Sequence, residues 1–232
     1  MNTPADYRAF AEEKLGVAFD DIELLITAFT HRSYLNEHKK TAKAHNERLE
    51  FLGDAVLELV VTEHLYLNFP DPEGILTNWR SSLVKTESIG AAATRLDFGA
   101  RLRLSRGEKK GGERARLQIL ANTYEAVIGA VYLDQGYGAA KDFIERTLLI
   151  TFKEILDTGS WMDPKSHLQE LAQSRDGYTP LYKVLEEFGP DHDKVFKIGV
   201  YVDGKLVGEG SGPSKQAGQV AAAEAALQHY QS

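Results

Sequence analysis

Residues 46–55 read NERLEFLGDA, and this stretch decides how the first part of the chain is interpreted. Its three carboxylates, Glu47, Glu50 and Asp54, stand among apolar residues of the kind that fill a protein core. At about 100° per residue, they fall within an arc of roughly 60° on one side of a helix. An acidic row in apolar surroundings is costly without counterions, so we expect cations to face it.

The rest of this helix is mostly apolar, which predicts that it is buried. Glu58 extends the acidic row by a turn, and Arg48 is the main polar exception on the other sides. A solvated acidic face is the usual alternative, and the apolar neighbours weigh against it. These neighbours are Leu49, Phe51, Leu52, Ala55, Val56, Leu57, Leu59 and Val60.

A second predicted helix, residues 117–134, carries a similar polar row. Gln118, Asn122 and Glu125 follow one another at i, i+4 and i+7, and most other positions are apolar. If the two rows face each other, they form a cluster of oxygen ligands that suits Mg²⁺ or Mn²⁺ better than Zn²⁺. A buried hydrogen-bonded pair would explain Asn122 and Glu125 equally well, but it explains the acids of the first helix less well.

The spacing of the acids leaves two metal chemistries to compare. A ferritin-like oxidase uses Glu-x-x-His pairs, but no histidine stands three positions after Glu47, Glu50 or Glu125. Carboxylate-bound magnesium acting on a phosphate needs no histidine, because such metals activate water and stabilise the leaving oxygen. The chain has no cysteine, which excludes thiolate zinc sites, disulfides and a cysteine nucleophile.

The composition is that of a globular protein, with 232 residues, 43% of them hydrophobic, and a net charge of −7. No stretch approaches the ~18 apolar residues of a membrane span, and the first residues lack the apolar run of a signal peptide, so we expect a cytoplasmic location and no membrane partner.

The negative charge argues weakly against a nucleic-acid partner. Residues 101–116, however, carry seven Lys or Arg against two Glu, which leaves +5. This segment is either a nucleic-acid contact or a solvated basic loop.

The sequence changes character near residue 158, which predicts two domains. Apolar residues recur at helical spacing before this point, so residues 1–158 are expected to form an all-α domain, followed by a linker at 159–162. Residues 163–232 read as a small α+β domain of order α-β-β-β-α, in which Pro164 opens the first helix and Ser214 caps the last. The strands are expected near 180–188, 194–203 and 206–212.

Several of these segments resemble motifs of the bacterial ribonuclease III family. The signature helix of that family is similar to NERLEFLGDAVLELVVTEHLY, residues 46–66, and its flanking motifs are similar to residues 28–37 and 121–144. Segments DPKSHLQELAQ, GPDH and GEGSGPSKQAGQVAAAEAAL of the second domain resemble a double-stranded RNA binding domain. The resemblance covers nearly the whole chain.

The resemblance implies a homodimeric endonuclease that cuts double-stranded RNA with Mg²⁺, for which Mn²⁺ can substitute, and that leaves 5′-phosphate and 3′-hydroxyl ends. It also implies processing of ribosomal and messenger RNA, and no nucleotide cofactor. By motif position, Asp54 and Glu125 would be catalytic. The set that would bind metal consists of Glu50, Asp54, Asn122 and Glu125 for the first ion, and Glu47 with Glu73 for a second.

One metal position departs from the family pattern, because Asn122 stands where Asp is usual. An amide oxygen can still ligate magnesium, but the site loses one negative charge and should bind metal more weakly. A non-cleaving double-stranded RNA binding protein with a degenerate metal site is therefore the alternative function.

The RNA contacts implied by the resemblance lie in the second domain. Such domains read the shape of an A-form duplex through its minor grooves and the phosphates between them. Gln169, Glu170 and His192 would reach minor grooves, and Lys215 would meet phosphates at the start of the last helix.

Overall fold

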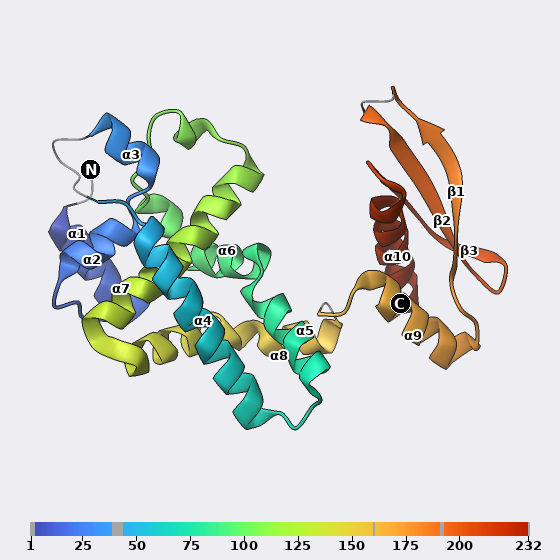
Figure 1. Cartoon of the computed structure of the whole chain (residues 1–232), viewed down its shortest axis with the longest axis horizontal. Helices are drawn as coiled ribbons and strands as arrows, with labels where there is room; N and C mark the ends of the chain where they lie inside the picture. Colours follow the sequence, from blue (N-terminus) through green and yellow to red (C-terminus); the bar gives the residue numbers. More distant parts are fainter. Residues whose placement is uncertain (1–2, 39–43, 160, 191–192, 232) are drawn as a thin grey trace. The chain divides into compact units, whose positions relative to one another are not determined.

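The computed structural model describes residues 3–38, 44–159, 161–190 and 193–231 (Figure 1). It divides into two compact units, residues 1–155 and 156–232. The first unit is built of helices, and the second contains a three-stranded antiparallel sheet with helices. The expected fold class, an all-α domain followed by an α-β-β-β-α domain, is confirmed.

The first unit is organised around two long helices, α4 (Glu47–Asn68) and α7 (Glu113–Thr147), which pack against each other. Gly136 has a φ of 81° and kinks α7. No helix in the described part of the chain is both long and apolar enough to cross a membrane. The remaining helices are α1 (Pro4–Phe10), α2 (Ile22–Ala28), α3 (Arg32–Glu37), α5 (Glu73–Val84), α6 (Thr86–Arg95) and α8 (Phe152–Thr158). Shorter helical turns lie at Ala11–Leu15, Phe98–Ala100, Glu108–Lys110 and Leu149–Thr151.

Two glycines allow α4 and α7 to approach very closely. A Cβ atom at Gly53 would collide with the carbonyl oxygen of Glu125, and one at Gly129 would collide with the carbonyl oxygen of Leu49. The two backbones therefore touch at the level of the acidic row. This contact sets the spacing between the polar row of α4 and that of α7.

An aromatic cluster fixes α7 from its other side. The rings of Phe29 and Phe98 lie 4.9 Å apart in an edge-to-face arrangement, and Tyr124 packs against Phe98. Tyr124 is fully buried, and its hydroxyl forms a 2.6 Å hydrogen bond with Thr147 Oγ1. Because Tyr124 directly precedes Glu125, this packing fixes the backbone that carries the Glu125 carboxylate.

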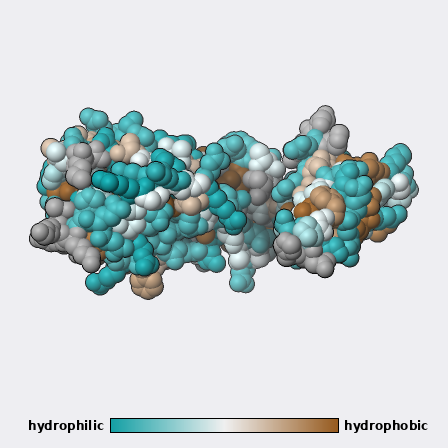
Figure 2. All heavy atoms as spheres, turned by 90° about the horizontal axis from the view of Figure 1, so that it is seen from above, coloured by the Kyte–Doolittle hydropathy of each residue, from teal (hydrophilic) through white to brown (hydrophobic). Residues whose placement is uncertain are grey.

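The prediction that α4 is buried on all its apolar sides is wrong. Phe51 is 82% exposed and Leu59 is 57% exposed, and Ala55 between them is also exposed. The reason is that α7 and α5 make the main contacts with α4 and leave one of its sides open. Apart from such positions, the surface of the first unit seen in Figure 2 is largely hydrophilic.

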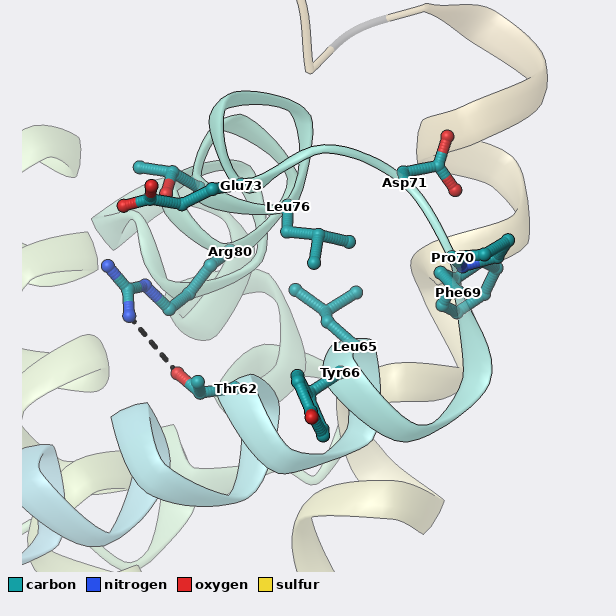
Figure 3. A pocket seen from close by; sticks show the side chains of 10 residues that line it. Thr62, Leu65, Tyr66, Phe69, Pro70, Asp71, Glu73, Leu76 and Arg80 are labelled. Carbon is teal, nitrogen blue, oxygen red and sulfur yellow. Dashed lines mark hydrogen bonds between the residues drawn. The ribbon is translucent and has the colours of Figure 1, made fainter.

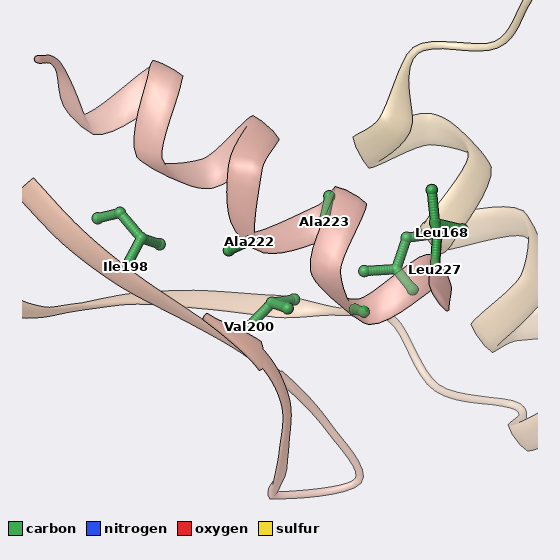
Figure 4. Close-up of a cluster of buried hydrophobic side chains, with 7 residues drawn as sticks. Leu168, Ile198, Val200, Ala222, Ala223 and Leu227 are labelled. Carbon is green, nitrogen blue, oxygen red and sulfur yellow. The ribbon is translucent and has the colours of Figure 1, made fainter. Parts of the chain in front are cut away.

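The second unit has the strand order β1-β2-β3, with helices α9 (Pro164–Asp176) and α10 (Lys215–Gln231). The strands are β1 (Leu181–Phe188), β2 (Val195–Val202) and β3 (Lys205–Gly212). Alternate β2 residues such as Ile198 and Val200 are buried against α10, as the alternation predicts (Figure 4). Asp203 and Gly204 both have positive φ, which suits the tight turn between β2 and β3.

Both predicted helix starts of the second unit are confirmed. Pro164 occupies the first turn of α9, and the Asp163 side chain accepts the Ser166 N–H as the N-cap. Before α10, Ser214 Oγ accepts the Ala217 N–H at 3.1 Å. The structure therefore caps each helix with the residue type that satisfies its free N–H groups.

The contact between α4 and α7 generates a stability prediction. Gly53→Ala should destabilise the protein by about 3 kcal/mol or more, because the new methyl group meets rigid backbone rather than a mobile side chain. Gly138→Ala on α7 is the control, since its methyl group would meet nothing within 4 Å and helix propensity favours Ala by up to about 1 kcal/mol. Urea unfolding measures both, and equal stability of the two variants would contradict the proposed role of the contact.

Candidate active site

The two polar rows meet between α4 and α7. The Asn122 amide of α7 lies close enough to the Glu50 carboxylate of α4 to lower its pKa. Glu50 and Asp54 also lie close enough to Glu125 to affect its ionisation. The structure thus brings together the four side chains expected at the first metal position.

Burial and mutual repulsion perturb the carboxylates of this cluster. Burial raises the pKa of Glu125 to about 8, and the negative charges of Asp54 and Glu50 add to the effect. Burial also raises the pKa of Glu50, as do Glu47 and Asp54, while the hydrogen bond from Asn122 lowers it. A divalent cation among these oxygens would remove the repulsion.

The donor set fits a hard cation, although the carboxylates are not yet gathered around one point. Carboxylate and amide oxygens are the ligands that Mg²⁺ and Mn²⁺ prefer. Within the described residues, no three His, Asp or Glu side chains form a group that could hold a metal ion as they stand.

Glu47 stands at the exposed start of α4 with two basic partners. Arg32 Nη1 lies 3.3 Å from Glu47 Oε1, and His45 Nδ1 lies 3.8 Å from Glu47 Oε2, too far for a hydrogen bond. Both residues directly flank the acidic row.

Gln118 is a further partner that sequence reasoning placed in the row without a role. Its Nε2 donates to Asn122 Oδ1 at 2.7 Å. The i, i+4 spacing of these residues was the signal in the sequence, because such pairs face each other on a helix.

The structure does not bring Glu73 to Glu47 within one chain. Glu73 lines a cavity of about 690 Å³ between α4 and α5, together with Thr62, Tyr66 and Arg80 (Figure 3). Arg80 donates to Thr62 Oγ1 at 3.1 Å. Since Thr62 follows Glu47 by fifteen residues, these ends of α4 are about 22 Å apart.

The basic segment 101–116 is anchored at one end and exposed beyond it. The Arg103 guanidinium donates to Thr30 Oγ1 and Tyr34 Oη and lies 4.5 Å from the centre of the Tyr34 ring. In contrast, Arg106 and Lys109 are exposed at a cavity of about 450 Å³. The segment therefore combines structural cations with solvent-facing ones.

The residues expected to bind RNA lie on the helices of the second unit. Gln169 and Glu170 are exposed on α9, and Lys215 is exposed in the first turn of α10. Lys165 in the first turn of α9 donates to Gln219 in the second turn of α10 at 2.7 Å, which links the two helices near their starts. His192 lies outside the described residues.

Comparisons with known proteins agree with this architecture. Residues 21–152 match the Ribonuclease-III-like family, and residues 164–230 match the double-stranded RNA binding motif. The chain therefore combines a nuclease domain with a double-stranded RNA binding module. A ribonuclease 3 of Enterococcus faecalis is 45% identical over 220 residues, which cover 93% of this chain and 94% of the relative. For a ribonuclease 3 of Natranaerobius thermophilus the identity is 47% over 221 residues, which cover 94% of each chain.

A solved structure shows the same relationship for the first unit. The nuclease domain of ribonuclease III from Campylobacter jejuni is 40% identical, with a TM-score of 0.53, and the match covers 60% of this chain and 96% of that one. The chain belongs to the ribonuclease III family. The expected activity, that of an endoribonuclease acting on double-stranded RNA, is confirmed at the level of this family.

The raised pKa of Glu125 predicts how stability depends on pH without metal. The folded protein keeps Glu125 protonated up to about pH 8, whereas the unfolded chain ionises near the usual value of 4.5. Wild type should therefore lose stability as the pH rises from 4.5 to 8. Glu125→Gln should remove this loss and be more stable at pH 9 by roughly 2 to 3 kcal/mol.

Thermal unfolding in EDTA at pH 5 and pH 9 measures this difference. The two proteins should be nearly equal at pH 5, because the carboxyl is protonated in the folded state of wild type. A wild type that is as stable as Glu125→Gln at pH 9 would contradict the burial of a repelled carboxylate.

Proposed function

We propose that this chain hydrolyses double-stranded RNA with a divalent cation bound between α4 and α7. Glu50, Asp54 and Glu125 would hold the cation, with Asn122 beside them, and Mg²⁺ or its substitute Mn²⁺ suits these oxygen donors. The observation that carries the proposal is the raised pKa of Glu125, since carboxylates that repel one another favour a cation. When bound, such a cation activates water for attack on phosphorus and stabilises the leaving oxygen.

The protein side chains around this position orient the acids. The Asn122 amide lies next to Glu50, and the packing of Tyr124 fixes the adjacent Glu125. Arg32 and His45 flank Glu47, which we assign to a second cation. Hydrolysis in this way needs no protein nucleophile and gives 5′-phosphate and 3′-hydroxyl ends.

We also propose that the protein is a homodimer. Phe51, Leu59 and Tyr66 follow one another at near-heptad spacing along α4, and all three are exposed. A row of large exposed apolar side chains is typical of a protein interface. Since Glu73 is remote from Glu47 in one chain, a joint role of these two acids would require a second copy.

The proposed RNA contacts come from both units. Exposed Gln169 and Glu170 suit the minor groove, and Lys215 suits phosphates at the start of α10. In the first unit, Arg106 and Lys109 are solvent-facing cations that would meet the backbone. Processing of ribosomal and messenger RNA, and a cytoplasmic location, remain predictions from the sequence.

Cleavage of a defined duplex tests the proposed reaction. Wild type should cut the duplex in the presence of Mg²⁺ and leave its separated strands intact, and Glu125→Gln should lower the rate at least about 10²- to 10³-fold by removing a charged ligand. Products are resolved on a denaturing gel, with EDTA and Ser81→Ala as controls, since Ser81 is an exposed residue of α5. Duplex binding without cutting, even with Mn²⁺, would instead support the non-cleaving alternative.

A second experiment tests the role of Lys215 in RNA binding. Lys215→Ala should weaken duplex binding and reduce the slope of log K against log salt by about 1, because one phosphate contact is lost. Lys183→Ala is the matched control. Lys183 is exposed on β1 and lies over the Tyr201 ring, while its neighbour Tyr182 packs toward the helices. Binding is measured by fluorescence anisotropy, and equal slopes for the two variants would contradict the assignment.

A further inference from the structure

The basic segment 101–116 is hydrogen-bonded to the chain around α3 before it continues into α7 (Figure 1). Its first contact is between backbones. The Arg103 N–H donates to the Phe29 carbonyl at 2.9 Å, and the Arg103 carbonyl accepts the His31 N–H at 3.1 Å. Bonds of this kind do not depend on which side chains the sequence supplies. They hold the start of the segment but not its later, more exposed part.

Two side chains of α3 bind the backbone of the next part of the segment. Ser33 Oγ accepts the Ser105 N–H at 3.1 Å. One turn further along α3, the Glu37 carboxylate accepts the Arg106 N–H, whose nitrogen lies 3.3 and 3.4 Å from the two carboxylate oxygens. Since a backbone N–H can only donate, both side chains act here as acceptors. An alanine at either position would remove the acceptor.

Ser105 links α3 to an exposed cation. Its Oγ accepts the Glu108 N–H at 3.2 Å, and its carbonyl accepts the Lys109 N–H at 3.2 Å. These two bonds support the short helical turn Glu108–Lys110, on which Lys109 is exposed. The position of Lys109 therefore depends on Ser105, and through Ser105 on Ser33.

Glu37 is an exposed acid at a cavity that is otherwise rich in basic residues. The cavity has a volume of about 450 Å³, and Arg106 and Lys109 line it together with Glu37. A carboxylate beside these cations opposes the approach of phosphates, so it is unfavourable on a surface that binds RNA. The hydrogen bond to the Arg106 backbone gives this acid a structural task that can offset the effect.

We propose that Ser33 and Glu37 are positioning residues for RNA binding, which hold the basic segment so that Arg106 and Lys109 face the phosphates of a duplex. The inference rests on the proposed function, in which these two cations meet the RNA backbone. Three glycines stand between positions 107 and 112, and a glycine-rich segment loses much conformational freedom when it binds a ligand. Holding the segment in place beforehand reduces this cost.

Duplex binding by the full chain in EDTA, measured by fluorescence anisotropy, tests this inference without cleavage. Ser33→Ala should weaken binding about fivefold, the usual effect of one hydrogen bond. Ser81→Ala is the matched control, because it makes the same chemical change at an exposed serine of α5 whose Oγ donates to the Thr77 carbonyl. This control should bind as wild type does. Urea unfolding checks that each variant is folded under the conditions of the assay.

The pair Glu37→Gln and Glu37→Ala separates positioning from charge. Both variants remove the same negative charge, which by itself should strengthen binding to phosphates. Glu37→Gln keeps an oxygen that can accept the Arg106 N–H, whereas Glu37→Ala keeps none. Glu37→Ala should therefore bind the duplex about fivefold more weakly than Glu37→Gln. Equal affinities of the two variants would overturn the role of Glu37.

A background without the two cations shows whether Ser33 acts through them. The variant Arg106→Ala/Lys109→Ala should bind more weakly and reduce the slope of log K against log salt by about 2, because two phosphate contacts are lost. In this background Ser33→Ala should cause no further loss of affinity. An undiminished loss there, or wild-type binding by the single variant Ser33→Ala, would overturn the role of Ser33.

This inference and the proposed function fail in distinguishable ways. If Arg106→Ala/Lys109→Ala binds the duplex as wild type does, the RNA contact proposed for the first unit is overturned, and the roles of Ser33 and Glu37 fall with it. If wild type binds the duplex but does not cut it with Mg²⁺, the proposed hydrolysis is overturned, while the binding data still decide the roles of Ser33 and Glu37.

Discussion

The backbone contact between α4 and α7 is the constraint on which the rest of the first unit depends. Gly53 and Gly129 let carbonyl groups of one helix reach the backbone of the other, so the helices meet without intervening side chains. Acids on α4 and polar residues on α7 are consequently held near each other. The acids of the candidate site are thus carried by helices and not by loops.

This closeness has an electrostatic cost, which the surrounding residues offset in part. Burial and neighbouring charges disfavour the ionised form of Glu125, and its pKa rises accordingly. The neutral amide of Gln118 donates to Asn122 without adding charge, and Arg32 pairs with the outermost acid, Glu47. The side chains of the protein therefore neutralise the acids of this cluster only in part.

Periodicity predicted the two polar rows and the order of the second unit, because hydrophobic spacing reports which side of an element is covered. It did not predict that Phe51 and Leu59 are exposed. An apolar residue favours burial, but the sequence does not show whether another part of the same chain packs against it. Glu73 lies at the same cavity as Arg80 because of the path that the chain takes from α4 to α5. Hydrophobic spacing along the sequence does not predict that path.

The alanine-rich packing of α10 has a consequence for sequence divergence in the second unit. Gly208 and Gly210 of β3 leave no room for a Cβ atom beside Ala222 and Ala226. Enlarging either partner would separate helix from sheet, so these positions are coupled and should not change independently. Changes on the covered side of this module should therefore be tolerated best as compensating pairs, while its solvent-facing side should accept single changes.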